Sequence, residues 1–212
     1  MKDKVEKRPV RNKEQSKQKF LDAVGKIITE KGFPGLKIND IAATAGLDKK
    51  LIYRYFGNLQ QLIDQYISTQ DFWSNVNEEQ TFEKIEDGGK TFVKSALKAQ
   101  FEYIRQNEAF RKLLLWRLSE EKESLRKLTE NQEASGEALF KSFIDPHFGK
   151  KAEQFRAISA ILVSGIYYLN LFSQFNGSVF CGIDLNTPEG KHSIEEALNL
   201  LVDLSYENIS DH

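Results

Sequence analysis

The residues best suited to chemistry in this sequence lie between positions 49 and 55. Lysine, arginine and tyrosine side chains gather there, at Lys49, Lys50, Tyr53, Arg54 and Tyr55. Lysine ammonium groups near the start of a helix can bond guanine edges or phosphates, and tyrosine hydroxyls can hold phosphates. These side chains favour contact with nucleic acid, and the alternative is a charged helix face that is merely solvated.

A short helix must position these side chains. Ile52 and Phe56 are four residues apart, so they share the inward face of a helix over residues 49–56 that ends at Gly57. Asp48 can cap this helix through its carboxylate. The other side chains then point away from the core or lie on its flanks: Lys49, Lys50, Leu51, Tyr53, Arg54 and Tyr55.

Two further helices precede this one. The first is predicted to begin near Glu14–Ser16 and to end at Gly32, with one apolar stripe formed by Phe20, Ala23, Val24, Ile27 and Ile28. The second is short, ends at Gly46 and directs four residues inward, namely Ile38, Ile41, Ala42 and Ala45. Three such helices with a tight turn at residues 46–48 predict a helix-turn-helix, whose last helix presents polar side chains to the major groove of DNA.

The charge of the chain is divided unevenly along its length. Residues 1–60 hold 14 Lys and Arg against 7 Asp and Glu, a net charge of +7. Residues 61–212 hold 16 against 24, a net charge of −8. A basic head on an acidic body indicates that only the head meets a polyanion, and this asymmetry alone does not choose between nucleic acid and another anionic surface.

The composition argues against several other classes of protein. With 40% hydrophobic residues, 4 Pro and 13 Gly in 212 residues, the chain is of the ordinary globular kind. One cysteine and three scattered histidines predict neither a disulfide framework nor a metal site, and we expect no cofactor. A Gly-rich phosphate loop and a nucleophile elbow are both missing from the sequence, so we expect no enzymatic activity.

The sequence also predicts a soluble, cytoplasmic protein without a membrane partner. The longest apolar stretch, residues 157–172, is interrupted by polar residues and falls short of the roughly 20 residues that span a bilayer. Residues 1–18 are polar and charged, without the apolar core of a secretory signal.

The remainder of the chain is expected to be helical, which makes the fold class all-α. Asn58 is predicted to cap a fourth helix, with Gln61 at its third position. Larger helices are expected at residues 89–106, 110–118, 125–143, 153–174 and 193–208, with a loop over 176–189. We therefore expect a basic flexible arm at residues 1–14, a three-helix DNA-binding domain at 15–58, and a larger helical ligand-binding and dimerisation domain at 59–212.

The N-terminal segment resembles a known family. Its pattern Ile41-Ala42, Ala45-Gly46, Tyr53 and Phe56 closely resembles the TetR family of bacterial transcriptional regulators, over residues 15–67. The resemblance implies a head that binds double-stranded operator DNA, and it places six residues toward the operator: Asn39, Lys49, Lys50, Leu51, Tyr53 and Tyr55. We add Thr44 as a candidate, although Thr44 and Asn39 could each satisfy local backbone groups instead.

Two positions depart from the family's pattern. Lys37 stands where the family usually has a serine or threonine that caps the second helix and touches a phosphate. Lys37 could replace the phosphate contact through its charge, without the cap. Leu59 stands where the family commonly has a phosphate-binding lysine, and it offers no replacement. We therefore expect DNA affinity to depend more on the basic N-terminal arm.

The resemblance also implies a small-molecule effector and a homodimer. Aromatic side chains of the body are the candidates for the effector site, with ordinary core packing as the alternative: Phe101, Trp116, Tyr168 and Phe172. The helices at about 153–174 and 193–208 correspond to the pair that forms a four-helix bundle between two copies in the family. The first of them is apolar nearly all round, which favours a second burial partner, although a monomer with this helix in a central core is the alternative.

The function that these observations favour is a ligand-responsive repressor that binds a palindromic operator as a dimer. The alternative is a helical protein that binds a ligand or partner and whose head no longer reads DNA sequence. Duplex binding that depends on salt and also on sequence would separate the two.

Overall fold

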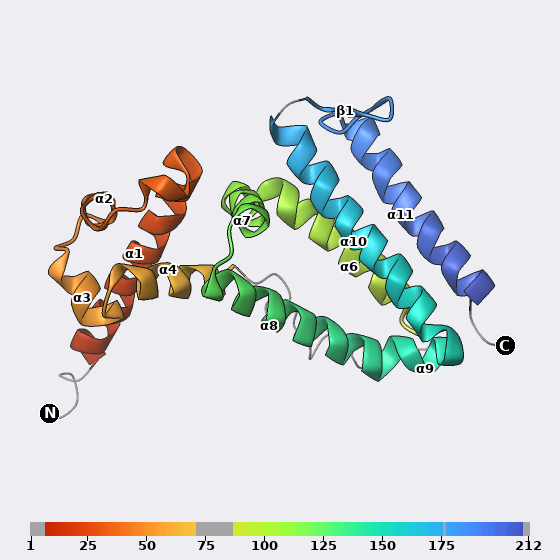
Figure 1. Ribbon diagram of the computed structural model, residues 1–212, viewed down its shortest axis with the longest axis horizontal. Coiled ribbons are helices and arrows are strands. Elements are labelled where there is room, and N and C mark those ends of the chain that lie inside the picture. Colours follow the sequence, from red (N-terminus) through yellow and green to blue (C-terminus); the bar gives the residue numbers. More distant parts are fainter. Residues whose placement is uncertain (1–6, 71–86, 176, 210–212) are drawn as a thin grey trace, which may run out of the picture. The chain divides into compact units, whose positions relative to one another are not determined.

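The computed structural model describes residues 7–70, 87–175 and 177–209, and these fall into two compact units. The first unit contains residues 7–70 and 108–128, and the second contains residues 87–107 and 129–209. Both are built from helices, as Figure 1 shows, which confirms the all-α fold class.

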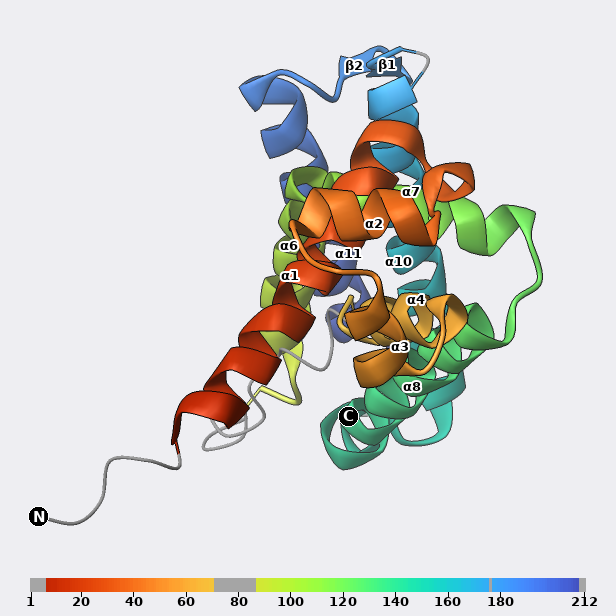
Figure 2. The ribbon, with the colours of Figure 1, turned by 90° about the vertical axis from the view of Figure 1, so that its left-hand side faces the viewer.

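The first unit contains the predicted helix-turn-helix. Its elements are α1 (Lys7–Lys31), the 3₁₀ turn η1 (Phe33–Gly35), α2 (Ile38–Ala45), α3 (Lys50–Phe56), α4 (Leu59–Ser68), α7 (Glu108–Ser119) and the first residues of α8 (Glu123–Leu139). Helix α1 packs against α2, α4 and α7 (Figure 2). The side chains at the centre of the helix-turn-helix core are fully buried and come from α1, α2, α3 and α4: Phe20, Val24, Ile28, Ile41, Ile52 and Leu62.

Helix α1 begins earlier than the sequence predicts. We expected a start near Glu14–Ser16, but the helix extends from Lys7. Pro9 is the only helix breaker near this end, and in the first turn of a helix proline is tolerated because its missing N–H has no partner there in any case. The apolar stripe begins only at Phe20, so periodicity could not reveal the polar turns that precede it.

The cap predicted for the fourth helix is confirmed. The Asn58 side-chain oxygen accepts a hydrogen bond of 2.9 Å from the backbone N–H of Gln61. Helix α4 then buries Leu62, Ile63 and Tyr66 on one face. An N-cap of this kind stabilises a helix by about 1 kcal/mol, and here it fixes the start of α4.

The second unit places α6 (Lys90–Gln106) against two long helices, α10 (Ala152–Phe175) and α11 (Pro188–Ile209). Between α8 and α10 lie a π-helical turn at Phe140–Ile144, α9 (Asp145–Phe148) and the 3₁₀ turn η4 (Gly149–Lys151). A two-stranded antiparallel hairpin joins α10 to α11, with β1 (Val179–Phe180) paired to β2 (Ile183–Asp184) in the register Val179 to Asp184. Figure 1 shows α10 and α11 side by side below this hairpin.

The last helix also begins earlier than expected. Its predicted start was Ser193, whereas α11 begins at Pro188. The Thr187 hydroxyl accepts a hydrogen bond of 3.0 Å from the backbone N–H of Gly190, and proline is favoured at the first position of a helix. These two residues form a start signal inside the segment that we expected to be a loop.

Aromatic packing closes the core of the second unit near the start of α6. Phe148 stacks on Phe155 with ring centroids 4.2 Å apart, and Tyr206 packs edge-on against both. The Tyr206 hydroxyl donates a hydrogen bond of 2.9 Å to the Gly88 carbonyl. Burial of this phenol raises the pKa of Tyr206, because the charged form would lose its water.

One stretch within residues 123–175 is long and apolar enough to cross a membrane by length and composition alone. Its helix α10 packs against α6, α9 and α11 and carries the buried side chains of Phe155, Leu162 and Ile166. A core helix of a soluble protein has this pattern too. On the other side of α10, Ile161 is 70% exposed and Tyr168 is 53% exposed in the single chain.

Candidate nucleic-acid interface

The turn between α2 and α3 is fixed by local backbone chemistry. Gly46 ends α2 with φ 65° and ψ 32°, a left-handed conformation that glycine adopts at low cost. The Leu47 N–H then donates to the Ala42 carbonyl at 3.1 Å, which closes the turn. The Asp48 carboxylate accepts a hydrogen bond of 2.8 Å from the Lys50 N–H and so starts α3. The capping role predicted for Asp48 is confirmed.

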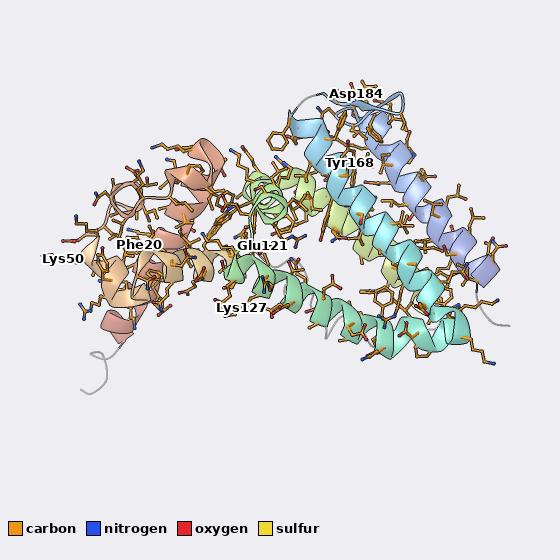
Figure 3. The ribbon with its side chains drawn as sticks, in the orientation of Figure 1. Phe20, Lys50, Glu121, Lys127, Tyr168 and Asp184 are labelled. Atoms are coloured by element: carbon orange, nitrogen blue, oxygen red, sulfur yellow. The ribbon has the colours of Figure 1, made fainter. Side chains whose placement is uncertain are left out.

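Helix α3 is held in place by two buried side chains. Ile52 is fully buried and Phe56 is nearly so, and Phe56 packs edge-on against Phe20 of α1 with ring centroids 6.0 Å apart. Lys49, Lys50, Tyr53 and Arg54 are all exposed on other faces of the helix. In Figure 3, Lys50 lies at the outer edge of the head while Phe20 lies among its helices. Apart from Leu51, the inward and outward faces of α3 are therefore as the spacing predicts.

The exposed cations of α3 and of the residue before α2 are not paired with acidic side chains in the described part of the chain. Among the residues that the structure describes, Lys37, Lys49, Lys50 and Arg54 form no ion pair with a carboxylate. Three of these unneutralised cations lie on or directly before α3 and Lys37 lies directly before α2, so the motif has a local positive potential. Phosphate groups of a nucleic acid are the polyanion that suits such a surface, because each contact releases a condensed counterion.

The two helices of the motif are linked by polar side chains on the same surface. The Lys49 ammonium donates a hydrogen bond of 3.2 Å to the Asn39 side-chain oxygen. The Asn39 amide group is left to donate elsewhere, and Thr44 is exposed on the same helix. Lys37 precedes α2 in an extended conformation without a side-chain cap. The loss of this cap agrees with the departure seen in the sequence.

The tyrosines of α3 differ in how much they are buried. Tyr53 is 55% exposed, with its ring outside the core. Tyr55 is half-buried and packs against the head core, and the Lys13 ammonium lies 6.0 Å from the centre of its ring. Both rings flank the exposed face of α3, as the sequence predicts.

Leu51 lies differently from the expectation. The sequence places it on the outward face, whereas the structure has it half-buried and packed against the head core. Leu51 follows Lys50 by about 100° around the helix, so its apolar side chain reaches the rim of the core. Its contact with DNA stays a prediction. Leu59, at the start of α4, packs against the same core, which explains an apolar residue there.

The comparisons with known proteins agree with this geometry. Residues 20–66 match the model of a protein family, the bacterial regulatory proteins of the tetR family. The head of this chain therefore contains an N-terminal domain of the TetR type. The matched segment covers the core of the head, including α2, α3 and most of α4.

Solved structures of TetR-like regulators have a similar fold over most of the chain. A transcriptional regulator of the TetR/AcrR family from Aquifex aeolicus VF5 superposes with a TM-score of 0.62 and 21% sequence identity, over 88% of this chain and 99% of that one. HlyIIR, a hemolysin II transcriptional regulator, superposes with a TM-score of 0.56 and 17% identity, over 94% and 99% of the two chains. A comparison with curated proteins finds no match. These likenesses establish a TetR-like fold.

The four aromatic residues predicted to line the effector site are spread over both units. Trp116 lies on α7 in the first unit, where its ring stacks on Phe33 with centroids 3.7 Å apart. Phe101 is buried in the second unit, on α6. Tyr168 and Phe172 stack on one another at the end of α10, with centroids 6.0 Å apart. The structure therefore groups only the last two of these four side chains.

A polar contact inside the second unit was missed in the sequence. Gln100 is only 1% exposed, and its amide donates a hydrogen bond of 3.0 Å to the Tyr167 hydroxyl. The Gln100 carbonyl oxygen is buried and has no hydrogen-bond partner in the described part of the chain. The signal was available, because Gln100 stands between Leu97 and Ile104 on the apolar stripe of α6. A glutamine at such a position needs a polar partner.

Proposed function

We propose that this chain is a ligand-responsive repressor that reads a palindromic operator as a homodimer in the cytoplasm. One observation carries the proposal: α3 is anchored by Ile52 and Phe56 and turns unpaired cations to the solvent. A rigid short helix with free donors on its outer face suits the major groove of DNA. The TetR-family domain supports this assignment of the head.

Each candidate residue of the head takes a role that its chemistry allows. Lys49 and Lys50 stand at the first turn of α3, where ammonium groups can reach guanine edges, and Leu51 lies next to them. The hydroxyls of Tyr53 and Tyr55 donate hydrogen bonds to phosphates on either side of the groove. Contacts with the phosphate backbone of DNA also come from α2 and the residue before it, through Lys37, Asn39 and Thr44. In this proposal residues 1–14 are the arm, 15–58 the reading domain, and 59–212 the domain that binds the effector and the second copy.

The apolar side chains that remain exposed in the single chain support a homodimer. On α10 these are Ile161, Tyr168 and Phe175, and on α11 they are Leu200, Leu201 and Leu204. Soluble monomers rarely leave several large apolar side chains exposed on adjacent helices, and a second copy across a two-fold axis would cover them. The two heads of such a dimer would read two half-sites of a palindrome.

The second unit supplies polar chemistry for an effector. The side-chain carbonyl oxygen of Gln100 is buried and accepts no hydrogen bond from the residues that the structure describes. The amide group of the same side chain donates a hydrogen bond to the Tyr167 hydroxyl. A small molecule with an N–H or O–H group would satisfy the carbonyl oxygen. By reciprocity, an effector that favours the form of the dimer without DNA must bind less tightly when operator is bound.

Selection of bound duplexes from a random DNA library at two salt concentrations tests the proposal. We expect one palindrome to be enriched, and to remain enriched at the higher salt. Binding without enrichment that vanishes as salt rises would overturn operator reading, because counterion release alone is independent of sequence. That result would favour the alternative, a helical ligand- or partner-binding protein whose head no longer reads sequence.

A further inference from the structure

The N-terminal half of α1 borders a polar groove next to the turn that leads into α3. The groove has a volume of about 470 Å³ and is lined by α1 side chains between Asn12 and Asp22 and by Leu47. Leu47 belongs to the turn itself and precedes Asp48, whose carboxylate caps α3. The groove therefore opens beside the first turn of α3.

A second contact brings the same part of α1 to the other end of α3. The Lys13 ammonium lies 6.0 Å from the centre of the Tyr55 ring, and Tyr55 is the penultimate residue of α3. Leu47 lies before the first residue of α3, so α1 borders the helix near both of its ends. Within the first unit, this stretch of α1 therefore comes close to the turn before α3 and to its penultimate residue.

The dimensions of DNA determine what such a flanking helix meets. The major groove is about 12 Å wide, and an α-helix with its side chains is about 10–12 Å in diameter. A recognition helix therefore fills the groove, and the elements beside it face the sugar–phosphate walls. Asn12, Gln15 and Lys19 stand on such a neighbouring element.

The chemistry of the groove fits a phosphodiester backbone. Lys19 is exposed and forms no ion pair among the residues that the structure describes, and the exposed amides of Asn12 and Gln15 are N–H donors. The one carboxylate in the lining, that of Asp22, accepts a hydrogen bond of 2.9 Å from the Gln18 amide. Ammonium and amide donors bind phosphate oxygens without reading the bases.

We propose that this α1 groove is a second DNA contact, which binds the phosphodiester backbone beside the bases that α3 reads. Lys19 supplies the charge, and Asn12 and Gln15 supply hydrogen-bond donors. The inference rests on the proposed DNA-binding function and extends it to a helix outside the helix-turn-helix. It gives the head an anchor on the DNA backbone where Leu59 provides none.

The salt dependence of DNA binding tests the α1 groove. The full chain is titrated, by fluorescence anisotropy at several salt concentrations, onto a labelled duplex with the selected palindrome and onto a scrambled duplex. For Lys19→Gln we expect the slope of log K against log salt to fall by about 1.8 for each bound dimer on both duplexes, because each of its two copies then neutralises one phosphate fewer. Lys19→Arg should keep the original slope.

Lys26→Gln is the matched control, because Lys26 is exposed on the same helix but pairs with Glu30 at 3.8 Å and does not line the groove. It should leave the slope unchanged. A second variant, Gln15→Glu, places a carboxylate in the groove and should weaken binding to both duplexes several-fold, with its helix content checked by circular dichroism.

The outcomes separate this inference from the proposed function. If the original chain binds DNA and the Lys19→Gln slope equals that of Lys26→Gln, the inference is wrong while operator reading stands. Full affinity of Gln15→Glu would likewise overturn it. If the original chain binds neither duplex at any salt, the proposed function fails and the inference fails with it.

Discussion

Ile52 and Phe56 set the orientation of every side chain on α3, since they are the two residues of this helix that are buried in the core. Neither side chain is available to DNA. Their burial fixes the rotation of α3 about its own axis, and that rotation decides that Lys49, Lys50 and Tyr53 face the solvent. At the scale of the residue, affinity for DNA therefore depends on groups that never touch it.

Replacement of Ile52 by alanine tests this dependence. Removal of a fully buried isoleucine side chain leaves a cavity and should lower the free energy of unfolding of the head by about 2–5 kcal/mol. Urea unfolding followed by circular dichroism would measure it. Arg54→Ala, at an exposed position of the same helix, should change the stability by less than about 0.5 kcal/mol. Equal stability of the two variants would contradict the anchoring role of Ile52.

The Tyr53 hydroxyl gives a prediction about binding alone. Because Tyr53 is 55% exposed, Tyr53→Phe should leave the melting temperature unchanged. A hydrogen bond to a charged phosphate contributes about 1.5–3 kcal/mol, so operator affinity should fall by at least about tenfold. Anisotropy titrations at several salt concentrations would measure the loss. Unchanged affinity at all of them would refute a phosphate contact by this hydroxyl.

At the scale of the element, ion pairs connect two helices of the second unit, α6 and α11. Lys90 and Lys94 of α6 both reach Asp203 of α11, at 2.7 and 2.6 Å, and Lys98 reaches Glu195 at 2.8 Å. Hydrogen bonds from Lys90 and Lys94 lower the pKa of Asp203. The hydrogen bond to Asp203 in turn raises the pKa of Lys90. The lysines stand one helical turn apart, so a single face of α6 carries all three contacts.

These pKa shifts predict how stability depends on pH. Folding lowers the pKa of Asp203, so the charged carboxylate stabilises the folded chain. This stabilisation is fully present above the ordinary pKa of about 3.9 and is lost as the pH falls through the lower pKa of the folded chain. The melting temperature should therefore drop below about pH 4, and Asp203→Asn should make that drop smaller. Glu130→Gln, at an exposed position of α8, is the control and should keep the full drop. If the melting temperature of Asp203→Asn depends on pH in the same way as that of the original chain, these ion pairs do not contribute to the drop.

The elements could be predicted from the sequence where the signal is local. The apolar stripe of α1, the Gly46 turn and the Asn58 cap each lie within a few residues, and the structure has all three. The early start of α1 was missed because Val10 is the one aliphatic residue before Phe20 and forms no apolar stripe by itself. The start of α11 was missed because Thr187 and Pro188 lie in a segment that otherwise has the composition of a loop.

Contacts between residues far apart in the chain could not be predicted in this way. Trp116 was a candidate for an effector site, but it stacks on Phe33, and nearby the Lys112 ammonium donates to the Thr29 carbonyl. These contacts attach α7 to α1 and to the turn η1 in the first unit. Periodicity shows which face of α7 is apolar and says nothing of which helix covers it. The placement of the candidate aromatic residues therefore required the structure.

At the scale of the whole molecule, charge and exposed apolar surface divide between the parts of the chain. The excess of positive charge lies in residues 1–60, and the remainder is acidic. Large apolar side chains stay exposed on α10 and α11 of the second unit. In the proposed function, the basic residues bind DNA and the exposed apolar face of α10 and α11 binds a second copy, and the acidic body does not compete for phosphate.

The proposed dimer gives a prediction that concerns the whole assembly. Leu201 is 45% exposed on α11 in the single chain, so Leu201→Glu should be tolerated by the fold. In a dimer that buries this face, an unpaired carboxylate costs at least about 2 kcal/mol, which lowers the association constant at least about thirtyfold. Light scattering should then show monomers, and binding to the full palindrome should fall toward that of a half-site.

Two controls make this result specific to the α10 and α11 face. Leu118→Glu changes a leucine that is 78% exposed on α7 of the first unit, and this variant should remain dimeric. The double variant Lys49→Ala, Lys50→Ala should lose specific DNA binding and also remain dimeric, because it alters only the head. A Leu201→Glu chain that stays dimeric with unchanged stability would show that Leu201 is exposed in the assembly, and the two-fold axis would then have to pass through another face.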